Sequence, residues 1–330
     1  MRTAHARVSV RSTDPAAATQ EFADDVRYYL SQTPRQLPSR YFYDALGSAL
    51  FDAICQLPWY RVTRAELALL AKHAPAILGK STAGDRLVEL GPGNGEKLAT
   101  LLAAGLPAKT GVELHLVDVS GAALATAARG LSGFESLRIV AHEATYESGL
   151  RQVSKEARVG GRTLVLFLGS NIGNFDPDAA ISFLRGMRAT LRAGDRLLLG
   201  ADLRKPEETL LLAYDDPLGV TAAFNLNLLL RLNRELDASI DLNGFRHEAL
   251  WNKKESRVEM HLVSTKAQRI LIPRASVDLT LREGDRIWTE SSYKYEPMEV
   301  TRLLARCGFS ARSQWVDTDA RFALTIAEVE

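Results

Sequence analysis

Cysteine is scarce in this chain, which has only Cys55 and Cys307 among its 330 residues. The two lie far apart and in apolar surroundings, so we expect buried free thiols in a reducing compartment rather than a disulfide framework. No group of cysteines and histidines has the spacing of a metal-binding motif. The sequence therefore predicts no metal site.

Long apolar runs and an excess of one charge are also missing. No run is long enough to span a bilayer, and the first twenty residues lack the apolar segment of a secretory signal. The 41 Lys and Arg residues balance 40 Asp and Glu, giving a net charge of +1, so neither nucleic acid nor a membrane is an expected partner. We expect a cytoplasmic monomer that has a poorly ordered N-terminal segment and that acts on a small molecule.

What the chain does have is an alternation of strand and helix patterns that begins at Arg86. Such an alternation predicts a parallel sheet with helices on both faces. The segment 164–168 is continuously apolar, as expected of a strand buried on both faces. We expect five strands here, at residues 86–90, 113–117, 137–140, 163–168 and 196–201.

A glycine-rich turn follows the first of these strands. Gly91, Gly93 and Gly95 alternate with other residues just after Glu89, and Asp118 ends the second strand. Glycines at such a turn let a ligand approach the backbone, and an acid at the end of the second strand typically accepts hydrogen bonds from a ribose. A flexible surface loop is the alternative for the glycines alone. With Asp118, the pattern predicts a nucleoside-bearing cofactor, either a dinucleotide or S-adenosylmethionine (SAM).

A second polar, glycine-containing loop, residues 169–175, follows the fourth strand. The carboxyl ends of parallel strands meet at one edge of a sheet, so this loop is a candidate for the substrate site. The alternative is an ordinary strand-to-helix turn in which Asn174 or Asp176 caps the next helix.

The pattern changes before and after this region. Ahead of it we expect helices at 21–30 and 48–56, and a helix capped by Thr63 with Glu66 completing the cap. After Arg204 the expected order is an insertion of non-alternating elements, followed by a return to the sheet. These later elements are helices at 207–215 and 221–236, a hairpin of 257–263 with 267–272 around a turn at 264–266, an extended segment at 287–295, a helix at 297–307, and strands at 311–316 and 323–327.

Several longer motifs are more specific than the glycine turn. They are Tyr41-Phe42-Tyr43-Asp44, Leu57-Pro58-Trp59-Tyr60, Val88-Glu89-Leu90-Gly91 with Glu96-Lys97, residues 167–174, residues 213–216 with 219–225, Glu259-Met260, and Thr289-Glu290-Ser291-Ser292. On these motifs the chain resembles, over nearly its whole length, the histidine Nα-methyltransferases of ergothioneine biosynthesis. That family uses SAM to convert L-histidine into its trimethylated betaine, hercynine.

The resemblance implies an α/β fold: a Rossmann-like SAM-dependent methyltransferase fold, with a mostly parallel seven-stranded sheet and an inserted α+β substrate-binding domain. It implies a SAM-binding domain of residues 65–204 plus 294–330, and a substrate-binding domain of residues 1–64 plus 205–293. SAM is the implied co-substrate, with no metal.

The resemblance also assigns residues. Cofactor contacts are expected from Tyr43, Gly91, Lys97 and Asp118, with Lys97 on the methionyl carboxylate and Asp118 on the ribose. The family often carries Gly-Asp-aromatic at the adenine, where this chain has Ala144-Thr145-Tyr146. Thr145 and Tyr146 are the candidates there, although a hydroxyl carries no charge.

For the substrate, the resemblance implies a clamp on the histidine carboxylate and amine, readers of the imidazole, and further pocket-lining residues. A carboxylate reader of the ring would disfavour indoles, which leave it less well paired. Asn174 or Tyr60 could hold a water that takes the amine proton, and the residues name no general base. The clamp is Asn174 and Tyr214, the readers are Glu290 and Ser292, and the lining residues are Tyr60, Gly169 and Met260.

Three alternatives stay open at this point. They are methylation of another aromatic amine such as a tryptophan derivative, an NAD-dependent oxidoreductase, and a non-catalytic binder on the same fold. All of the site assignments depend on one spatial expectation. The insertion with Tyr214 and Glu290 should fold over the mouth formed by Gly91 and Asn174.

Overall fold

The structure, a computed structural model, describes residues 9–11, 15–79, 84–105, 111–134, 137–156, 158 and 160–330. The chain divides into two compact units. Unit 1 comprises residues 1–12, 62–204 and 294–330, and unit 2 comprises residues 13–61 and 205–293.

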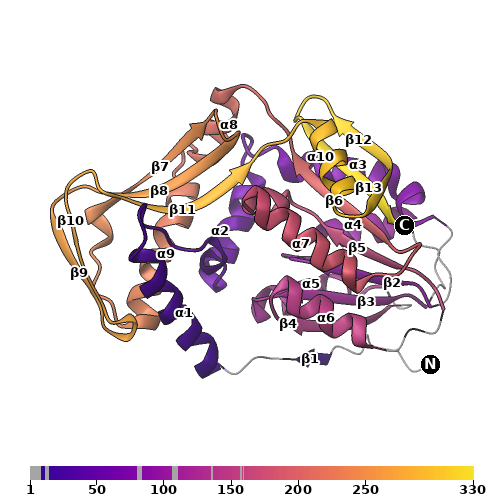
Figure 1. Cartoon of the computed structure of the whole chain (residues 1–330), viewed down its shortest axis with the longest axis horizontal. Helices are drawn as coiled ribbons and strands as arrows, with labels where there is room; N and C mark the ends of the chain where they lie inside the picture. The colour runs from indigo at the N-terminus through magenta and orange to yellow at the C-terminus, as the bar shows by residue number, and fades with distance from the viewer. Residues whose placement is uncertain are drawn as a thin grey trace. The chain divides into compact units, whose positions relative to one another are not determined.

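Unit 1 is built on one eight-stranded sheet with the order β1-β4-β3-β2-β5-β6-β13-β12 (Figure 1). All neighbouring strands are parallel except β13, which runs antiparallel to both β6 and β12. Seven of these strands form the predicted methyltransferase-type sheet, and β1 adds an eighth at the edge. The strands are β1 (Ser9–Arg11), β2 (Arg86–Leu90), β3 (Glu113–Asp118), β4 (Arg138–Glu143), β5 (Thr163–Phe167), β6 (Arg196–Asp202), β12 (Phe309–Asp317) and β13 (Phe322–Val329).

Helices cover both faces of this sheet (Figure 1). On one face α3 packs on α4 and α4 on α5, and on the other α7 packs between α6 and α10. One part of the core lies under α6, α7 and α10, where Val88, Val165 and Leu199 of the central strands meet apolar helix residues. The helices are α3 (Val62–Leu78), α4 (Glu96–Gly105), α5 (Gly121–Gly130), α6 (Tyr146–Lys155), α7 (Pro177–Thr190) and α10 (Pro297–Arg306), with the 3-10 helix η2 (Asn171–Asn174) after β5.

Unit 2 is a smaller α+β assembly. A three-stranded antiparallel sheet with the order β11-β8-β7 packs against α8 and α9, and α9 also packs against α2. A two-stranded sheet joins β9 to β10. The elements are α1 (Pro15–Leu30), η1 (Ser39–Phe42), α2 (Ala45–Gln56), α8 (Glu207–Tyr214), α9 (Val220–Leu236), η3 (Leu242–Gly244), β7 (Phe245–Asn252), β8 (Arg257–Ser264), β9 (Gln268–Ile272), η4 (Pro273–Ala275), β10 (Val277–Leu281) and β11 (Arg286–Tyr293).

Three predictions of local structure are wrong. The segments 257–263 and 267–272 do not pair as a hairpin, because β8 is the central strand between β7 and β11 and already has both edges paired. Thr63 does not cap a helix, because α3 begins one residue earlier, at Val62. The poorly ordered start, expected over residues 1 to about 20, is wrong for residues 15–20, which are the first part of α1. Residues 1–8 and 12–14 lie outside the described residues.

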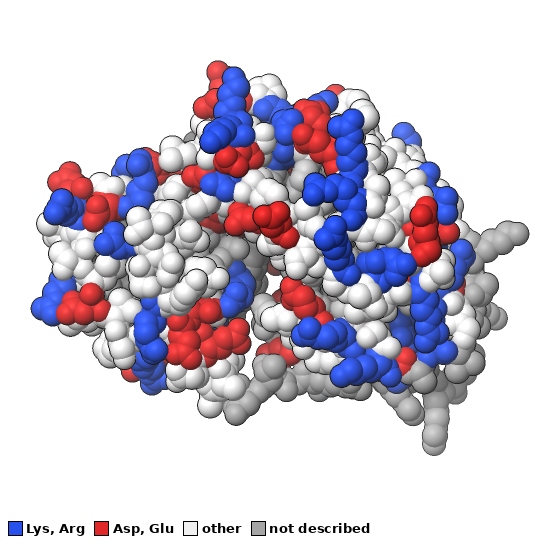
Figure 2. Space-filling view, in the orientation of Figure 1, with Lys and Arg blue, Asp and Glu red and all other residues white. Residues whose placement is uncertain are grey.

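Charged side chains of both signs are mixed on the face shown in Figure 2, as the nearly neutral composition leads one to expect. Among the described residues, no helix combines the length and the apolarity needed to cross a membrane.

Candidate functional site

The glycine turn of unit 1 lies between β2 and α4, at the point where the strand order reverses. Strand β2 pairs with β3 on one side and β5 on the other. Open α/β sheets typically bind ligands at such a point, beyond the carboxyl ends of the strands. Gly91 has a φ of +72° and its N–H donates to the carbonyl of Val117 at 2.8 Å. A Cβ at Gly91 would lie 2.8 Å from Tyr146 Oη. Only glycine fits this turn without strain.

Asp118 and Tyr146 lie beside the same turn. Asp118 is the last residue of β3 and accepts a hydrogen bond from the Ser120 N–H at 2.8 Å. Burial of its carboxylate raises the pKa of Asp118 to about 6, and burial likewise raises the pKa of Tyr146, with the nearby Asp118 charge adding to that rise. Thr145 is the N-cap of α6, where its hydroxyl accepts from the Ser148 N–H at 3.3 Å. Gly91, Asp118 and Tyr146 are therefore brought together.

Lys97 is held by an acid that sequence reasoning assigned to a helix cap. Glu66 is fully buried on α3, and its Oε2 lies 2.8 Å from Lys97 Nζ. Both of its carboxylate oxygens accept from the Gly169 N–H, at 2.8 and 3.0 Å. A Cβ at Gly200 would lie only 2.1 Å from Glu66 Oε1, so the glycine on β6 leaves the space that this carboxylate occupies. Glu66 thus joins Lys97 of the first loop to Gly169 of the second.

Glu89 is a second buried acid, on β2 immediately before the turn. Burial raises the pKa of Glu89 to about 8, against the pull of the Lys97 charge, and Glu66 and Asp118 raise it further. Its Oε2 has no hydrogen-bond partner among the residues that the structure describes. A buried carboxyl oxygen without a partner is costly, and a cationic group placed there would compensate it.

The second loop of unit 1 has left-handed backbone at Gly169 and Ser170, with φ of +74° and +60°. Ser170 Oγ accepts from the Asp202 N–H at 2.9 Å. Asp202 in turn forms an ion pair with Lys294 at 3.0 Å, and both side chains are almost fully buried. Asn174 is the last residue of η2 and is partly buried. The hydrogen bond of Ser170 to Asp202 holds the loop that carries Asn174.

In unit 2, the predicted residues Tyr43, Tyr60 and Tyr214 belong to one aromatic cluster. Tyr60 meets Tyr214 edge to face with ring centroids 6.4 Å apart, and on its other side it meets Phe51 at 6.2 Å. Phe224 lies 5.7 Å from Tyr43 and 5.9 Å from Phe51. Edge-to-face contacts of this kind fix the rings.

The predicted ring readers lie on one face of the β11-β8-β7 sheet. Glu290 of β11 is directly opposite Met260 of β8, and Ser292 is opposite Val258. The Tyr214 hydroxyl and Ser292 Oγ are 2.8 Å apart and share a hydrogen bond. The register of β11 shifts between Trp288 and Glu290, and such a bulge re-aims the side chains that follow it.

A buried polar network supports this bulge. The Thr289 hydroxyl lies 2.8 Å from Asn225 Oδ1 and 3.0 Å from the Met260 carbonyl. Asn225 Nδ2 lies 2.8 Å from His247 Nδ1, and His247 Nε2 lies 2.8 Å from the Tyr214 carbonyl. One network therefore joins the segment of Tyr214 to the strand of Glu290, and it explains the Asn225 and Thr289 positions of the sequence motifs.

Asp216 explains another motif position. Its carboxylate accepts N–H groups of Leu218, Val220 and Thr221, which begin α9. Burial alone would raise its pKa, but the backbone hydrogen bonds from Thr221, Val220 and Leu218 lower the pKa of Asp216 below the usual value. The acid thus starts α9 and places Phe224 and Asn225 one turn further on.

Within each unit, then, the predicted residues converge. Gly91, Lys97, Asp118, Tyr146 and Gly169 gather in unit 1, and Tyr60, Tyr214, Met260, Glu290 and Ser292 are linked in unit 2. Tyr43, expected at the cofactor, belongs to the aromatic cluster of unit 2. The expectation that the insertion covers the glycine turn stays a prediction, as do the individual roles. Glu66, Asn225, His247 and Thr289 were missed or misassigned because their partners are distant in sequence. Glu89 was noted beside the glycine turn without a role, because its burial depends on the packing of the sheet.

The mostly parallel sheet, the glycine turn after β2 and the acid ending β3 are typical of a Rossmann-like fold with a site for a nucleoside-bearing cofactor. Among solved structures, a magnesium protoporphyrin IX methyltransferase from Synechocystis with bound SAH aligns with a TM-score of 0.46 and 10% identity, covering 88% of this chain and 98% of that one. A model of the family described as histidine-specific, SAM-dependent methyltransferases matches residues 22–329. The chain belongs to this family.

Curated relatives span several activities. A histidine N-alpha-methyltransferase of Mycolicibacterium smegmatis is 39% identical over 94% of this chain and 96% of its own length. The ergothioneine biosynthesis protein 1 of Neurospora crassa is 28% identical over 86% of this chain and 32% of its own length. An L-tryptophan methyltransferase of Psilocybe serbica is 25% identical over 88% of this chain and 87% of its own.

Proposed function

We propose that this enzyme transfers three methyl groups from SAM to the α-amino nitrogen of L-histidine, giving hercynine, a step of ergothioneine biosynthesis. The observation that carries the proposal is the face of the unit 2 sheet on which Glu290, Met260 and Ser292 lie together with Tyr214. The 39% identity to the mycolicibacterial histidine N-alpha-methyltransferase over almost the full length supports the same substrate.

The residues of unit 1 fit SAM. The co-substrate carries a carboxylate, an amino group, a ribose and a methyl-bearing sulfonium, whose positive charge makes the methyl group transferable. Lys97 would pair with the carboxylate and Asp118 would accept from the ribose hydroxyls. The partnerless Oε2 of Glu89 would accept from the amino group. Gly91, with a φ of +72° and no side chain of its own, would let the cofactor approach the backbone of the turn.

The residues of unit 2 fit the imidazole end of histidine. Glu290 would accept the ring N–H, and Ser292 would provide a second polar contact while it stays hydrogen-bonded to Tyr214. The buried thioether of Met260, 2% exposed, would limit the width of the space for the ring. A neutral indole would leave the carboxylate of Glu290 less well paired, and buried polar groups without a partner penalise the wrong substrate strongly.

Asn174 and Tyr214 would hold the amino and carboxylate groups of histidine. Orientation of the amine against the methyl donor can supply up to about 7–11 kcal/mol of the barrier reduction, so a catalytic triad is not required. The amine loses a proton before each transfer. A water held by Asn174 or Tyr60 would accept it, and the aromatic cluster around Tyr60 would attract the cationic product.

Product mass tests this proposal directly. The protein is incubated with SAM and, separately, L-histidine, its mono- and dimethyl derivatives, and L-tryptophan. We expect histidine to gain one, two and finally three methyl groups, with S-adenosylhomocysteine formed in step, and tryptophan to stay unchanged. Products that stop at one or two methyl groups would contradict trimethylation, and methylation of tryptophan alone would replace the substrate assignment.

A further inference from the structure

Two histidines and a glutamate that the proposed reaction does not use come together inside unit 1. His115 lies on β3 and His142 on β4, and both are fully buried. His115 is opposite Val140, and His142 is opposite Val117, so both imidazoles lie on the same face of the sheet. Glu156 is the C-cap residue of α6, which covers that face. Strands and helix thus bring together three residues that no sequence motif connects.

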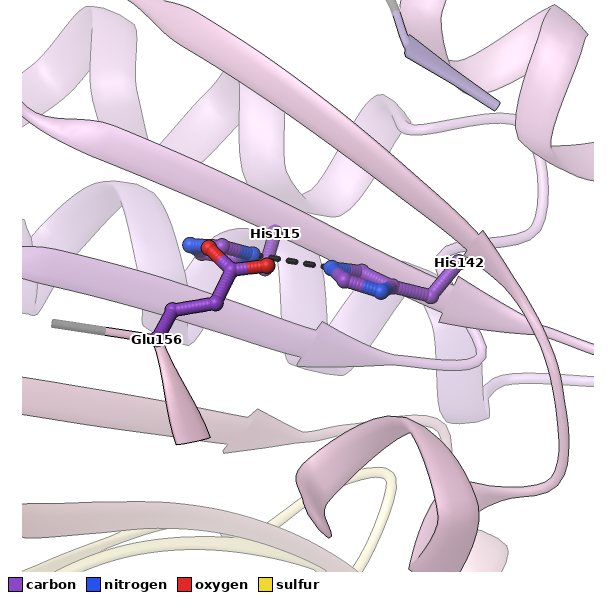
Figure 3. A group of neighbouring side chains, drawn as sticks. All are labelled: His115, His142 and Glu156. Atoms are coloured by element: carbon purple, nitrogen blue, oxygen red, sulfur yellow. Dashed lines mark hydrogen bonds between the residues drawn. The ribbon is translucent and has the colours of Figure 1, made fainter. Parts of the chain in front are cut away.

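The potential ligand atoms of these three side chains are close. His115 Nδ1 and His142 Nε2 are 2.9 Å apart, and each side chain offers one atom such that all three lie within 4.8 Å of one another. Figure 3 shows the two imidazoles end to end, joined by this contact, with the Glu156 carboxylate beside the His115 ring.

The outer nitrogens of the two imidazoles each face an oxygen. His142 Nδ1 lies 3.1 Å from Gln152 Oε1. His115 Nε2 lies 3.2 Å from Glu113 Oε2, at ion-pair distance but without the alignment of a hydrogen bond. If each outer nitrogen carries the hydrogen that its oxygen can accept, both inner nitrogens are bare and their lone pairs face each other. A cation between the inner nitrogens removes that repulsion. Histidine ligands of metals are typically oriented in this way, by an outer carboxylate or carbonyl oxygen.

We propose that His115 Nδ1, His142 Nε2 and the Glu156 carboxylate bind one divalent transition-metal ion, with Zn²⁺ the best match. Two imidazole nitrogens and a carboxylate oxygen are a donor set that zinc accepts, with a fourth position left for water. Tetrahedral zinc requires about 3.3 Å between ligand atoms. The inner nitrogens would therefore move apart by about 0.4 Å, and the Glu156 carboxylate would approach the ion from beside the His115 ring.

The surroundings can accommodate the charge. Glu113 forms ion pairs with the nearby Arg86 and Arg138, at 2.8 and 2.6 Å. Glu156 then brings a negative charge to the ion itself.

The ion would have a structural role. It would connect β3, β4 and the end of α6. His115 is the third residue of β3, whereas Asp118 at the end of that strand faces the glycine turn. Removal of the metal should therefore lower the stability of unit 1 and leave cofactor affinity unchanged.

A metal-free arrangement competes with this proposal. If the Gln152 amide is turned so that its nitrogen donates to His142 Nδ1, a chain of single hydrogen bonds runs through both rings toward Glu113, and no cation is required. The two arrangements differ in one proton. With metal, neither inner nitrogen is protonated, and without it, one of them is.

Metal retention is the first test. Untagged protein is loaded with Zn²⁺, dialysed against a weak chelator, and analysed for bound metal and for its thermal midpoint. We expect one equivalent of zinc to stay bound and the midpoint to rise relative to the metal-free protein. Protein that retains no zinc and shows no shift in midpoint would overturn the proposal.

Variants locate the ion. Glu156→Gln preserves shape and should weaken zinc binding at least about 10-fold, and Gln152→Ala, a change in a positioning residue, should weaken it about 10–100-fold. His73→Gln is the matched control, because His73 is a unit 1 histidine that stacks on Trp315 away from the cluster. Zinc affinity that is unchanged in Glu156→Gln would contradict the assignment.

Spectroscopy needs no variant, which matters because changes of buried histidines destabilise the fold. Substitution of Co²⁺ in the wild-type protein should give the visible bands of a four-coordinate ion. Histidine ¹⁵N spectra should show both inner nitrogens unprotonated with Zn²⁺ bound. A proton that stays shared between His115 Nδ1 and His142 Nε2 in the presence of zinc would establish the metal-free chain instead.

Discussion

The two units of this enzyme differ in the kind of polar side chain that they bury. Unit 1 buries ionisable side chains deeply, and unit 2 buries mainly neutral polar groups: Thr221, Asn225, Asn227, Ser264, Thr289 and Ser292, besides His261 and Asp216. The buried charged residues of unit 1 are Glu66, Arg86, Glu89, Asp195, Asp202 and Lys294.

Burial of a charge is costly unless it is paired, so the difference is informative. Glu66 is paired with Lys97, and Asp202 with Lys294, whereas Glu89 has an oxygen with no partner among the described residues. This suits a unit whose ligand brings charges of its own. The neutral hydrogen bonds of unit 2 suit the positioning of a ring. The comparison predicts that variants of unit 1 change cofactor affinity and that variants of unit 2 change substrate choice.

The largest expected effect is that of Glu290→Ala. Loss of the carboxylate should lower kcat/KM for histidine by about 10³–10⁴-fold, because a site built around a hydrogen-bonding group depends on it. Affinity for S-adenosylhomocysteine, measured by calorimetry, should stay within about twofold of wild type. Glu255→Ala, a change of an exposed acid in the same unit, is the control. Equal histidine turnover in Glu290→Ala and wild type would refute the assigned role.

Glu66→Gln should have the next largest effect, on the other unit. The amide can still accept from the Gly169 N–H, but Lys97 loses the charge that holds it. We expect affinity for S-adenosylhomocysteine to fall about 10–100-fold, the equivalent of about 1.5–3 kcal/mol for a charge-assisted contact. Michaelis constants for histidine at saturating SAM should change little. A variant that binds the cofactor normally but loses histidine would reverse the comparison between the units.

Cofactor binding should depend on pH through Asp118. Since burial raises the pKa of Asp118 to about 6 and ribose hydroxyls need the ionised acceptor, affinity should fall as the pH drops through 6, by up to about tenfold per pH unit. The raised pKa also means that protonation stabilises the folded state. Asp118 therefore contributes stability at low pH that is lost as the pH rises from about 4 to 6.

Asp118→Asn is the matching variant. It should flatten both pH profiles, of cofactor affinity by calorimetry and of the free energy of unfolding by denaturant titration. An affinity profile that keeps its acid limb in Asp118→Asn would show that another group titrates.

Thr289→Val should have the smallest effect. It preserves the shape of the side chain and removes the hydroxyl that lies near both Asn225 and Met260, which should cost about 1–3 kcal/mol of stability. A less firmly held bulge should raise the Michaelis constant for histidine a few fold and leave cofactor affinity unchanged. Thr280→Val on β10 is an exposed control in the same unit. A loss of cofactor binding in Thr289→Val would contradict the division of roles.

Local sequence patterns predicted the fold better than they predicted the site. The strand at 86–90 and Asp118 at the end of the next were predicted correctly, because apolar periodicity and glycine turns are encoded within a few residues. Motif resemblance supplied Glu290 and Tyr214. It did not supply the bulge before Glu290, which depends on how β11 registers with β8.

Partners distant in the chain were beyond such reasoning. The residues around Glu66 predict that it caps a helix, yet its carboxylate accepts a hydrogen bond from the N–H of Gly169, 103 residues away. His115, His142 and Glu156 follow no ligand spacing and meet only because β3, β4 and α6 pack together. The expected hairpin failed for the same reason, because two strands that could pair locally found partners elsewhere.

The places where the chain leaves and re-enters the sheet unit are fastened to each other. Leu203 and Tyr295 form a parallel bridge, the Arg204 N–H donates to the Tyr295 carbonyl at 2.9 Å, and the Tyr295 N–H donates to the Asp202 carbonyl at 3.1 Å. The 89 residues from 205 to 293 therefore form an insertion whose two ends are joined to the sheet unit at the same place. Evolution or a protein engineer could replace this insertion with one suited to another amine and leave the residues of unit 1 that hold the methyl donor unchanged.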